Sequence, residues 1–405
     1  MFALEKRAEF FDLQAKRMLV LAFAAAVLST ALLSVATALV IVFWLLSGRF
    51  AATWQRVKTE PVVWMVLGLL GLSLIGMAYT PAPLNEALEG AGKYAKLALL
   101  PLAVFLLDDM RWVKRALYAF LGALALAVFA SYLEGYGLTP DWTAKGDSTA
   151  FAGHITLSLF EALGAFIAFT LARFEPQRRT LWIILGLFFL SHLFILNTGR
   201  TGQVLALAML AVLMFQLLRW KGVLIGGLAA VLLIAGAWFG SAQFQQRLLV
   251  GVHDLQQYEQ GDSRNSLGAR LDFWSNSLKI IQDKPLTGHG TASLKAVYPA
   301  YASANGWLTD NPHNEFLMVT IQWGFLALAL LLGLFIAMAQ ASGRLAPEAG
   351  AIMWGVLTAY ALGGLFNSLL LDHREGMMFA MLVGLLLAWR PARLAGKPSP
   401  EPSST

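Results

Sequence analysis

The chain has 405 residues, of which 58% are hydrophobic and only 13% charged, and its formal net charge is +6. A soluble protein carries about 25% charged residues, so the composition excludes a soluble domain. Many apolar runs approach the roughly 20 residues that a helix needs to cross a bilayer, and the alternating pattern of an outer-membrane barrel is absent. We therefore predict an all-α, polytopic membrane protein. The absence of cysteine excludes a disulfide-stapled external domain and a thiolate metal site.

The first apolar run, Met18 to Leu46, follows a basic N-terminus and has about 29 residues. It lacks a small-residue cleavage site, so we expect a retained membrane segment and not a removed signal peptide. The run is too long for one perpendicular helix and short for two, and a turn near Ser29 and Thr30 would divide it. Two helices place the basic segment 49–58 on the side of the N-terminus, whereas one helix places it on the opposite side.

Ten further spans bring the expected total to about twelve. They cover residues 61–79, 93–107, 112–134, 151–172, 180–196, 201–218, 222–239, 314–339, 350–370 and 375–389. The chain then divides into 1–240 with nine membrane helices and a cytoplasmic N-terminus, 241–313 as a long periplasmic loop with an amphipathic helix, 314–390 with three membrane helices, and 391–405 as a disordered cytoplasmic tail.

Lysine and arginine fall in alternate short loops, and such loops face the cytoplasm. In a membrane protein, an excess of basic residues sets which side of the membrane each loop faces. It therefore does not indicate a nucleic acid partner. The opposite face receives the segments 80–92, 135–150, 197–200, 241–313 and 371–375. Most of the unusual polar residues therefore gather at one face of the membrane.

Arg200 begins a predicted span directly after Asn197, Thr198 and Gly199. The free amides at a helix start and a guanidinium together suit an anion such as phosphate. An arginine at a helix end can also extend to lipid headgroups, and the sequence leaves both interpretations open.

An amphipathic helix is predicted inside the long loop. Its apolar positions recur at helical spacing, at Leu267, Leu271, Trp274, Leu278 and Ile281. We expect this helix to lie on the membrane surface or over the bundle, with Trp274 as its anchor. Arg270 either contacts a buried anion or pairs with Asp272 or Asp283 in solvent.

His313 stands immediately before a long apolar run. We expect Asn311 to cap the helix and Pro312 to be its first residue, which puts His313 in the first turn. The helix dipole there disfavours imidazolium, and a neutral imidazole is what a general base requires. A histidine that only hydrogen-bonds the loop is the alternative.

Two further segments contribute candidates. The glycine-rich stretch 286–291 lacks the Lys-Ser/Thr ending of a P-loop, so we expect a close turn there, with His289 as a secondary candidate. In the charged turn 372–375, local ion pairing accounts for most of the charges, while Asp372 is able to orient a neighbouring base or arginine. No Asp-x-Asp pair occurs in an external loop, so neither a metal nor another cofactor is expected.

Three motifs together resemble the O-antigen ligase family, which also includes O-antigen polymerases and bacterial oligosaccharyltransferases. They are Arg200 at a helix start, the run 268–274 followed by 285–290, and the run 311–317 leading to Trp323 and Gly324. The resemblance spans most of the chain. It implies a GT-C-like glycosyltransferase of the bacterial inner membrane with its active site facing the periplasm.

The resemblance also implies substrates and roles. The donor would be a polysaccharide on undecaprenyl diphosphate, and the acceptor a sugar hydroxyl of lipid A core, with membrane lipids around both. His313 would be the catalytic base, and Arg200 and Arg270 would bind the diphosphate. Asp372, His289 and Glu315 would support them. Transfer would be metal-independent and inverting, and the oligomeric state stays open, with a monomer as the simplest case.

Two rival functions fit parts of the sequence. A polymerase or a protein-directed oligosaccharyltransferase of the same superfamily often has larger external segments than the one loop here, which favours a ligase. A lipid-linked glycan transporter or flippase belongs to a different class. The absence of internal symmetry and the gathering of polar features at one face argue against transport.

Overall fold

The computed structural model describes residues 2–140, 149–240, 265–302 and 307–390, with 242, 245–246 and 249–250 in addition. These residues form α-helices, short 3₁₀ turns and loops, without a strand. The expected tail 391–405 and most of the first part of the long loop lie outside the described residues.

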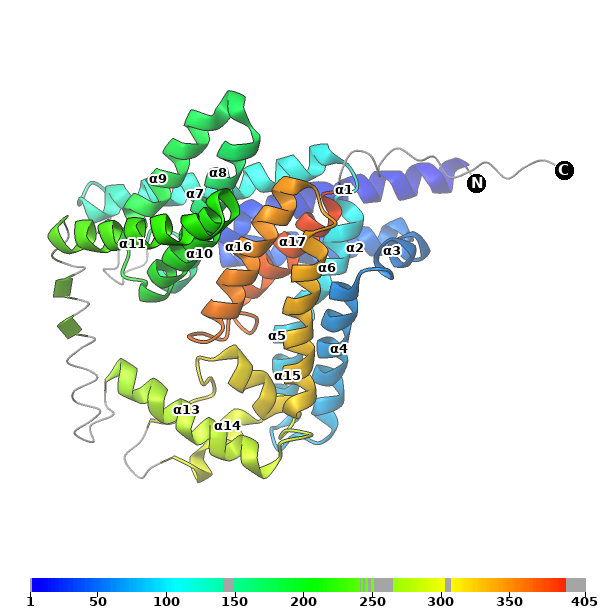
Figure 1. Cartoon of the computed structure of the whole chain (residues 1–405). Helices are drawn as coiled ribbons and strands as arrows, with labels where there is room; N and C mark the ends of the chain where they lie inside the picture. The colour runs from blue at the N-terminus through cyan, green and yellow to red at the C-terminus, as the bar shows by residue number, and fades with distance from the viewer. Residues whose placement is uncertain are drawn as a thin grey trace.

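The helices follow the predicted apolar runs closely (Figure 1). In chain order they are α1 (Phe2–Leu28), α2 (Thr30–Ser47), α3 (Phe50–Val57), α4 (Pro61–Ile75), α5 (Leu84–Ala95), α6 (Leu99–Leu106), α7 (Met110–Gly135), α8 (His154–Phe174), α9 (Arg179–Ile195), α10 (Arg200–Leu218), α11 (Trp220–Gly240), α13 (Ser266–Asp283), α14 (Leu294–Val297), α15 (Glu315–Ser342), α16 (Pro347–Gly363) and α17 (His373–Ala388).

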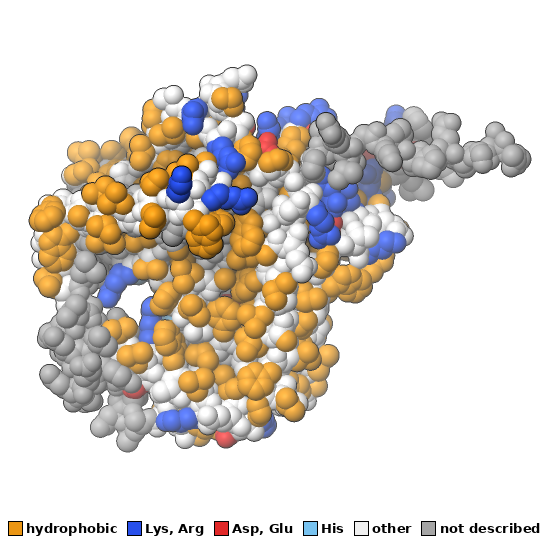
Figure 2. Space-filling model, in the orientation of Figure 1, with side chains coloured by type: hydrophobic (Ala, Val, Ile, Leu, Met, Phe, Trp, Pro, Cys, Tyr) orange, Lys and Arg blue, Asp and Glu red, His pale blue; other side chains and the backbone are white. Residues whose placement is uncertain are grey.

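Seven stretches in the described part of the chain are long and apolar enough to cross a membrane. They are Thr30–Ser47, Pro61–Ala78, Met110–Gly135, His154–Phe174, Pro176–Ile195, Arg200–Leu218 and Glu315–Ser342. Hydrophobic side chains cover much of the visible surface of α4 and α15 (Figure 2), and Trp64 and Leu326 are exposed there. Exposed apolar flanks on long helices are what a lipid environment permits, so the chain is a multi-pass membrane protein. The total of about twelve spans stays a prediction.

The first apolar run is two helices, as the turn near Ser29 suggested. Ser29 has an extended backbone, and its hydroxyl accepts a hydrogen bond from Leu32 N at 3.3 Å, which caps α2. α1 and α2 then pack against each other along the chain reversal.

The expected span 93–107 is wrong as a single membrane helix. The polar segment before it, expected as an external loop, is largely the helix α5, which continues through a 3₁₀ turn at Lys96–Ala98 into the eight-residue α6. A search for apolar runs does not find α5, because its exposed side contains lysine and glutamate and its buried side consists only of small residues and Tyr94.

α15 is kinked at Trp323 and Gly324, where Gly324 has φ +72°. The freed backbone is satisfied from the 285–291 segment, since Phe325 N donates to Pro285 O at 2.8 Å. A Cβ on Gly324 would lie 2.1 Å from Leu286 O, so only glycine fits at this close approach. The glycine-rich segment is therefore a close turn against the bundle, as expected.

α13 lies over the end of the bundle, beside α14 and the first half of α15 (Figure 1). A small hydrophobic cluster joins these elements, made of Phe273, Ile280, Ile281, Leu294, Tyr298, Met318 and Ile321. The indole of Trp274 donates to Pro312 O at 3.0 Å. The helix therefore lies over the bundle, one of the two expected positions, and Trp274 anchors it to the protein backbone.

Candidate active site

Arg200 is the first residue of α10, and side-chain hydrogen bonds hold the turn before it in place. Gly199 N donates to Asn197 Oδ1 at 2.8 Å, and Asn197 Nδ2 donates to Glu161 Oε2 at 2.9 Å. Glu161 lies fully buried in α8, and its other carboxyl oxygen contacts His192 Nδ1. A buried carboxylate requires such partners. This network fixes where the Arg200 backbone begins.

Glu161 was missed by reasoning from the sequence, although a lone acid in the middle of an apolar run is a visible signal. A charged residue inside a membrane span is a functional or structural candidate by default. Its contacts give it a structural role under Arg200.

Removing Glu161 is expected to weaken the fold. Glu161→Ala leaves His192 and Asn197 without their buried partner, and loss of one member of a buried charged network costs about 3–5 kcal/mol. Glu161→Gln keeps an acceptor for Asn197 and should cost less. Thermal melting in detergent measures the difference, and equal melting temperatures for the wild type and Glu161→Ala would contradict this role.

Arg270 approaches Arg200 although the two are far apart in sequence. Burial lowers the pKa of Arg270, and the Arg200 charge lowers it further. In the described part of the chain, no carboxylate lies within ion-pair distance of either guanidinium. The expected alternative, a pair with Asp272 or Asp283, is not among the ion pairs of the described residues, and the Asp283 carboxylate instead accepts from the Tyr301 hydroxyl. Two neighbouring cations without an acidic partner among the described residues are chemically suited to an anion.

His313 has left-handed backbone geometry, with φ +51°. Its N–H donates to Asn311 Oδ1 at 2.8 Å, and the side chain of Asn314 caps α15 by accepting from Leu317 N at 3.0 Å. The expectation that Asn311 caps the helix and that His313 lies in its first turn is therefore wrong. Asn311 instead forms a side-chain turn ahead of the helix, a conformation that asparagine favours.

The imidazole of His313 packs against α13. Its ring stacks on Phe273 with centroids 6.4 Å apart and planes at 28°. Burial lowers the pKa of His313, Arg270 lowers it further, and Asp310 opposes them. A neutral imidazole is therefore favoured, by burial and a neighbouring guanidinium instead of by a position within the helix.

The loop between α16 and α17 connects the Arg200 end of the site to the His313 end. Asn367 Nδ2 donates to Thr201 Oγ1 at 3.4 Å, and Ser368 Oγ donates to Asn311 Oδ1 at 2.8 Å. Glu315 Oε2 accepts from Leu370 N at 2.7 Å and holds the same loop. The fold thus brings three of the predicted site residues into one region, namely Arg200, Arg270 and His313. Glu315, which is also a predicted site residue, is buried and holds the backbone of the α16–α17 loop in place.

His289 does not join this region. Its side chain is buried, and Nε2 contacts Ile280 O at 3.0 Å, while its N–H donates to Ile321 O at 2.8 Å. These contacts fasten the glycine-rich turn to α13 and α15, so the structure gives His289 a packing role in place of the expected supporting one.

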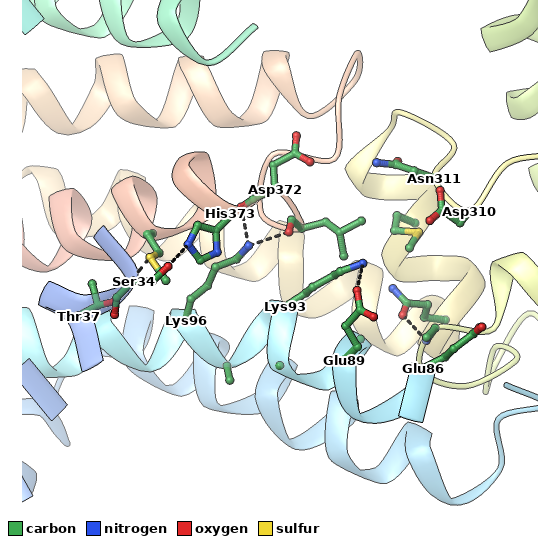
Figure 3. Close-up of a pocket in the computed structure, with 18 of the residues that line it drawn as sticks. Ser34, Thr37, Glu86, Glu89, Lys93, Lys96, Asp310, Asn311, Asp372 and His373 are labelled. Carbon is green, nitrogen blue, oxygen red and sulfur yellow. Dashed lines mark hydrogen bonds and ion pairs between the residues drawn. The ribbon is translucent and has the colours of Figure 1, made fainter. Parts of the chain in front are cut away.

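Asp372 lies on a groove of about 760 Å³ that also contains Lys96 (Figure 3). Lys96 Nζ donates to the carbonyl oxygens of Leu371 and Asp372. Burial raises the pKa of the Asp372 carboxyl to about 7, and the Glu375 charge adds to the effect. Sequence reasoning missed Lys96, and its signal was a lysine inside the expected apolar span 93–107.

The charged turn is held by tertiary contacts, so the expectation of local ion pairing is wrong. The Arg374 guanidinium donates to Thr30 Oγ1 at 2.7 Å and to Phe151 O at 2.9 Å, and Glu375 accepts from the Thr156 hydroxyl. These bonds join the starts of α2, α8 and α17.

Residues 185–332 match a family model described as O-antigen ligase. A comparison with curated proteins gives no match. The matched segment includes Arg200, Arg270 and His313, the same three residues that the fold gathers at one site. The match to this segment supports membership of the O-antigen ligase family.

Proposed function

We propose that the chain is an O-antigen ligase, a GT-C-like enzyme that transfers a polysaccharide from undecaprenyl diphosphate to a sugar hydroxyl of lipid A core. The observation that carries the proposal is the pair of guanidiniums, Arg200 and Arg270, without an acidic partner among the described residues and beside His313. A site of this kind suits a reaction that releases a diphosphate and removes a proton from a hydroxyl.

In the proposed reaction His313 accepts the proton of the acceptor hydroxyl. The hydroxyl oxygen attacks the anomeric carbon of the donor sugar from the side opposite the diphosphate, so configuration at that carbon inverts. The bond between the anomeric carbon and the diphosphate oxygen breaks, and the departing electron pair stays on the diphosphate. Arg200 and Arg270 neutralise this charge, which allows the reaction to proceed without a metal.

A periplasmic position of the site is part of the proposal. On the visible face, lysine and arginine side chains gather near α1, α8 and α9, whereas fewer lie around α13 and α14 (Figure 2). Basic residues favour the cytoplasmic side, which supports a periplasmic location for α13 and His313. A donor that carries its own diphosphate also fits a compartment without nucleotides.

The supporting residues have different parts in the proposal. Glu315 positions the α16–α17 loop through Leu370 N, and this loop in turn contacts the turn at His313. Asp372 lies on the groove next to Lys96 and is proposed to act on substrate placement, away from the guanidinium pair.

The test is transfer by the purified protein in detergent. The wild type is given an undecaprenyl-diphosphate glycan and lipid A core in the presence of a chelator, and the glycan shift is followed on a gel. Transfer to lipid A core is the expected result. Lengthening of the donor glycan would indicate a polymerase, modification of an added acceptor protein would indicate an oligosaccharyltransferase, and the absence of any product would contradict a transferase.

The acidic limb of the pH–rate profile is expected to depend on Arg270. The positive charge of Arg270 lowers the pKa of His313, so wild-type activity should fall only below the ordinary histidine value of about 6.5. Arg270→Gln removes that charge, raises the pKa, and moves the acidic limb to higher pH. Lys279→Gln, which removes an α13 charge that does not affect the His313 pKa, is the control. An acidic limb at the same pH in all three proteins would contradict the arrangement.

A further inference from the structure

The groove beside Asp372 has two different ends. It runs along α5 between α2 and the α16–α17 loop (Figure 3). At the end near Thr37 it is lined by Ala38, Ile41, Leu99 and Met377, and at the other end by Glu86, Lys295, Asp310 and Asn311. The first end thus includes apolar residues of the candidate membrane span Thr30–Ser47, and the other end is polar.

The charges in the polar part are mixed. Lys93 pairs with Glu89 at 3.0 Å and Lys295 with Glu86 at 2.6 Å, while Lys96 is satisfied by backbone carbonyls. Exposed ion pairs of this kind are worth about 0–1 kcal/mol, so a ligand can open them at little cost. Carboxylates accept hydrogen bonds from hydroxyl groups, and ammonium groups donate to their oxygens. Such a lining suits a hydroxyl-rich sugar headgroup.

This composition contrasts with the guanidinium pair. Arg200 and Arg270 have no carboxylate partner in the described chain, whereas each exposed lysine in the groove has one. The groove contains no residue of α10 or α13. The arginines are therefore better suited than the groove to bind a diphosphate, and the groove is available to bind a second substrate.

The groove reaches the proposed base. Asn311 lines its polar end, and the same side-chain oxygen accepts the N–H of His313 at 2.8 Å. On the α13 side, His313 is flanked by Phe273 and Arg270. His313 thus lies between Asn311, which lines the groove, and Arg270 of the guanidinium pair.

We propose that this groove binds the acceptor, an amphiphile whose sugar headgroup lies against Glu86, Asp310 and Asn311 and whose acyl chains leave along Ala38 and Ile41 of α2. The inference rests on the proposed function and adds to it the position and the amphiphilic character of the second substrate. The acceptor hydroxyl then approaches His313 from the groove, and the donor diphosphate is held on the other side by the arginines.

Gly92 allows a direct test of this assignment. It is an exposed residue of α5 that lines the groove, and a Cβ added there meets nothing within 4 Å. Tryptophan favours a helix more than glycine does, so the substitution should not unfold α5. Gly92→Trp fills the groove. Gly122→Trp serves as the matched control, because it adds the same side chain at an exposed glycine of α7 that does not line the groove and whose added Cβ also meets nothing within 4 Å.

Two measurements are made on the full-length protein in detergent, namely binding of fluorescently labelled lipid A core and transfer kinetics with each substrate varied. We expect Gly92→Trp to weaken lipid A core binding and to raise the acceptor KM by about tenfold or more, with the donor KM and undecaprenyl-diphosphate binding unchanged. Gly122→Trp should behave as the wild type.

The outcomes separate this inference from the proposed function. A raised donor KM, or weakened undecaprenyl-diphosphate binding, would assign the groove to the donor and overturn the inference. Wild-type binding and kinetics in Gly92→Trp would show that no substrate uses the groove. If the wild type transfers nothing while Gly92→Trp alone loses lipid A core binding, the proposed function fails and the groove assignment stands.

Discussion

His313→Ala is expected to lower the transfer rate by about 10²- to 10⁴-fold, the range usual for loss of a general base. The ring stands next to Arg270 and is stacked on Phe273, with a lowered pKa that keeps the imidazole neutral. The buried His289, the other histidine singled out in the sequence, is bonded to Ile280 O instead. The measurement is the initial rate of glycan transfer to lipid A core at saturating substrates.

The backbone at His313 calls for a second variant. With φ +51°, alanine is strained there by about 1–2 kcal/mol, whereas asparagine is tolerated. His313→Asn keeps the turn and removes the base. Both variants should lose the same activity, and only His313→Ala should also melt earlier. Near-normal turnover in His313→Asn would remove His313 from the chemistry.

Arg200→Gln is expected to lower transfer by about 10²- to 10³-fold, the cost of removing one donor from a developing negative charge. Arg200→Lys should also be damaging, because a point charge does not reproduce the planar, two-pronged contact of a guanidinium with phosphate. Both variants should weaken binding of undecaprenyl diphosphate, which can be measured without turnover.

Arg179 provides a matched control for Arg200. Each arginine is the first residue of a helix, α9 and α10 respectively, but Arg179 is exposed and lies at the other end of α9 from the 197–200 turn. Arg179→Lys should transfer at the wild-type rate. Equal activity of Arg200→Lys and Arg179→Lys would show that Arg200 contacts lipid headgroups and takes no part in binding the diphosphate.

Most of the helices could be predicted from the sequence because their causes are local. An apolar run of membrane length forms a helix whatever its neighbours are, so the starts of α7, α8 and α10 fall within a few residues of the predicted spans. Ser29 divides the first run because a serine hydroxyl caps a helix with a bond to a residue three positions away.

The sequence also identified the three residues of the proposed chemistry, and it did so for different reasons. Arg200 stood out by its position at a helix start, and His313 by the break between a polar interval and an apolar run. Arg270 was ambiguous, because helical spacing does not tell which side of α13 meets the protein. Its approach to Arg200 depends on packing between segments distant in the chain.

By itself, then, the sequence determined that this chain is a helical membrane protein with polar candidates gathered in a few loops, since hydrophobic length and helix capping act over a few residues. Only the tertiary structure decided that Arg270 approaches Arg200, that Trp274 binds Pro312 O, and that Lys96 lines a groove next to Asp372. Each of these depends on a hydrogen bond or on burial between segments far apart in the chain. The hydrophobic periodicity of a sequence segment does not predict such contacts, because they stabilise the protein only after the helices have packed.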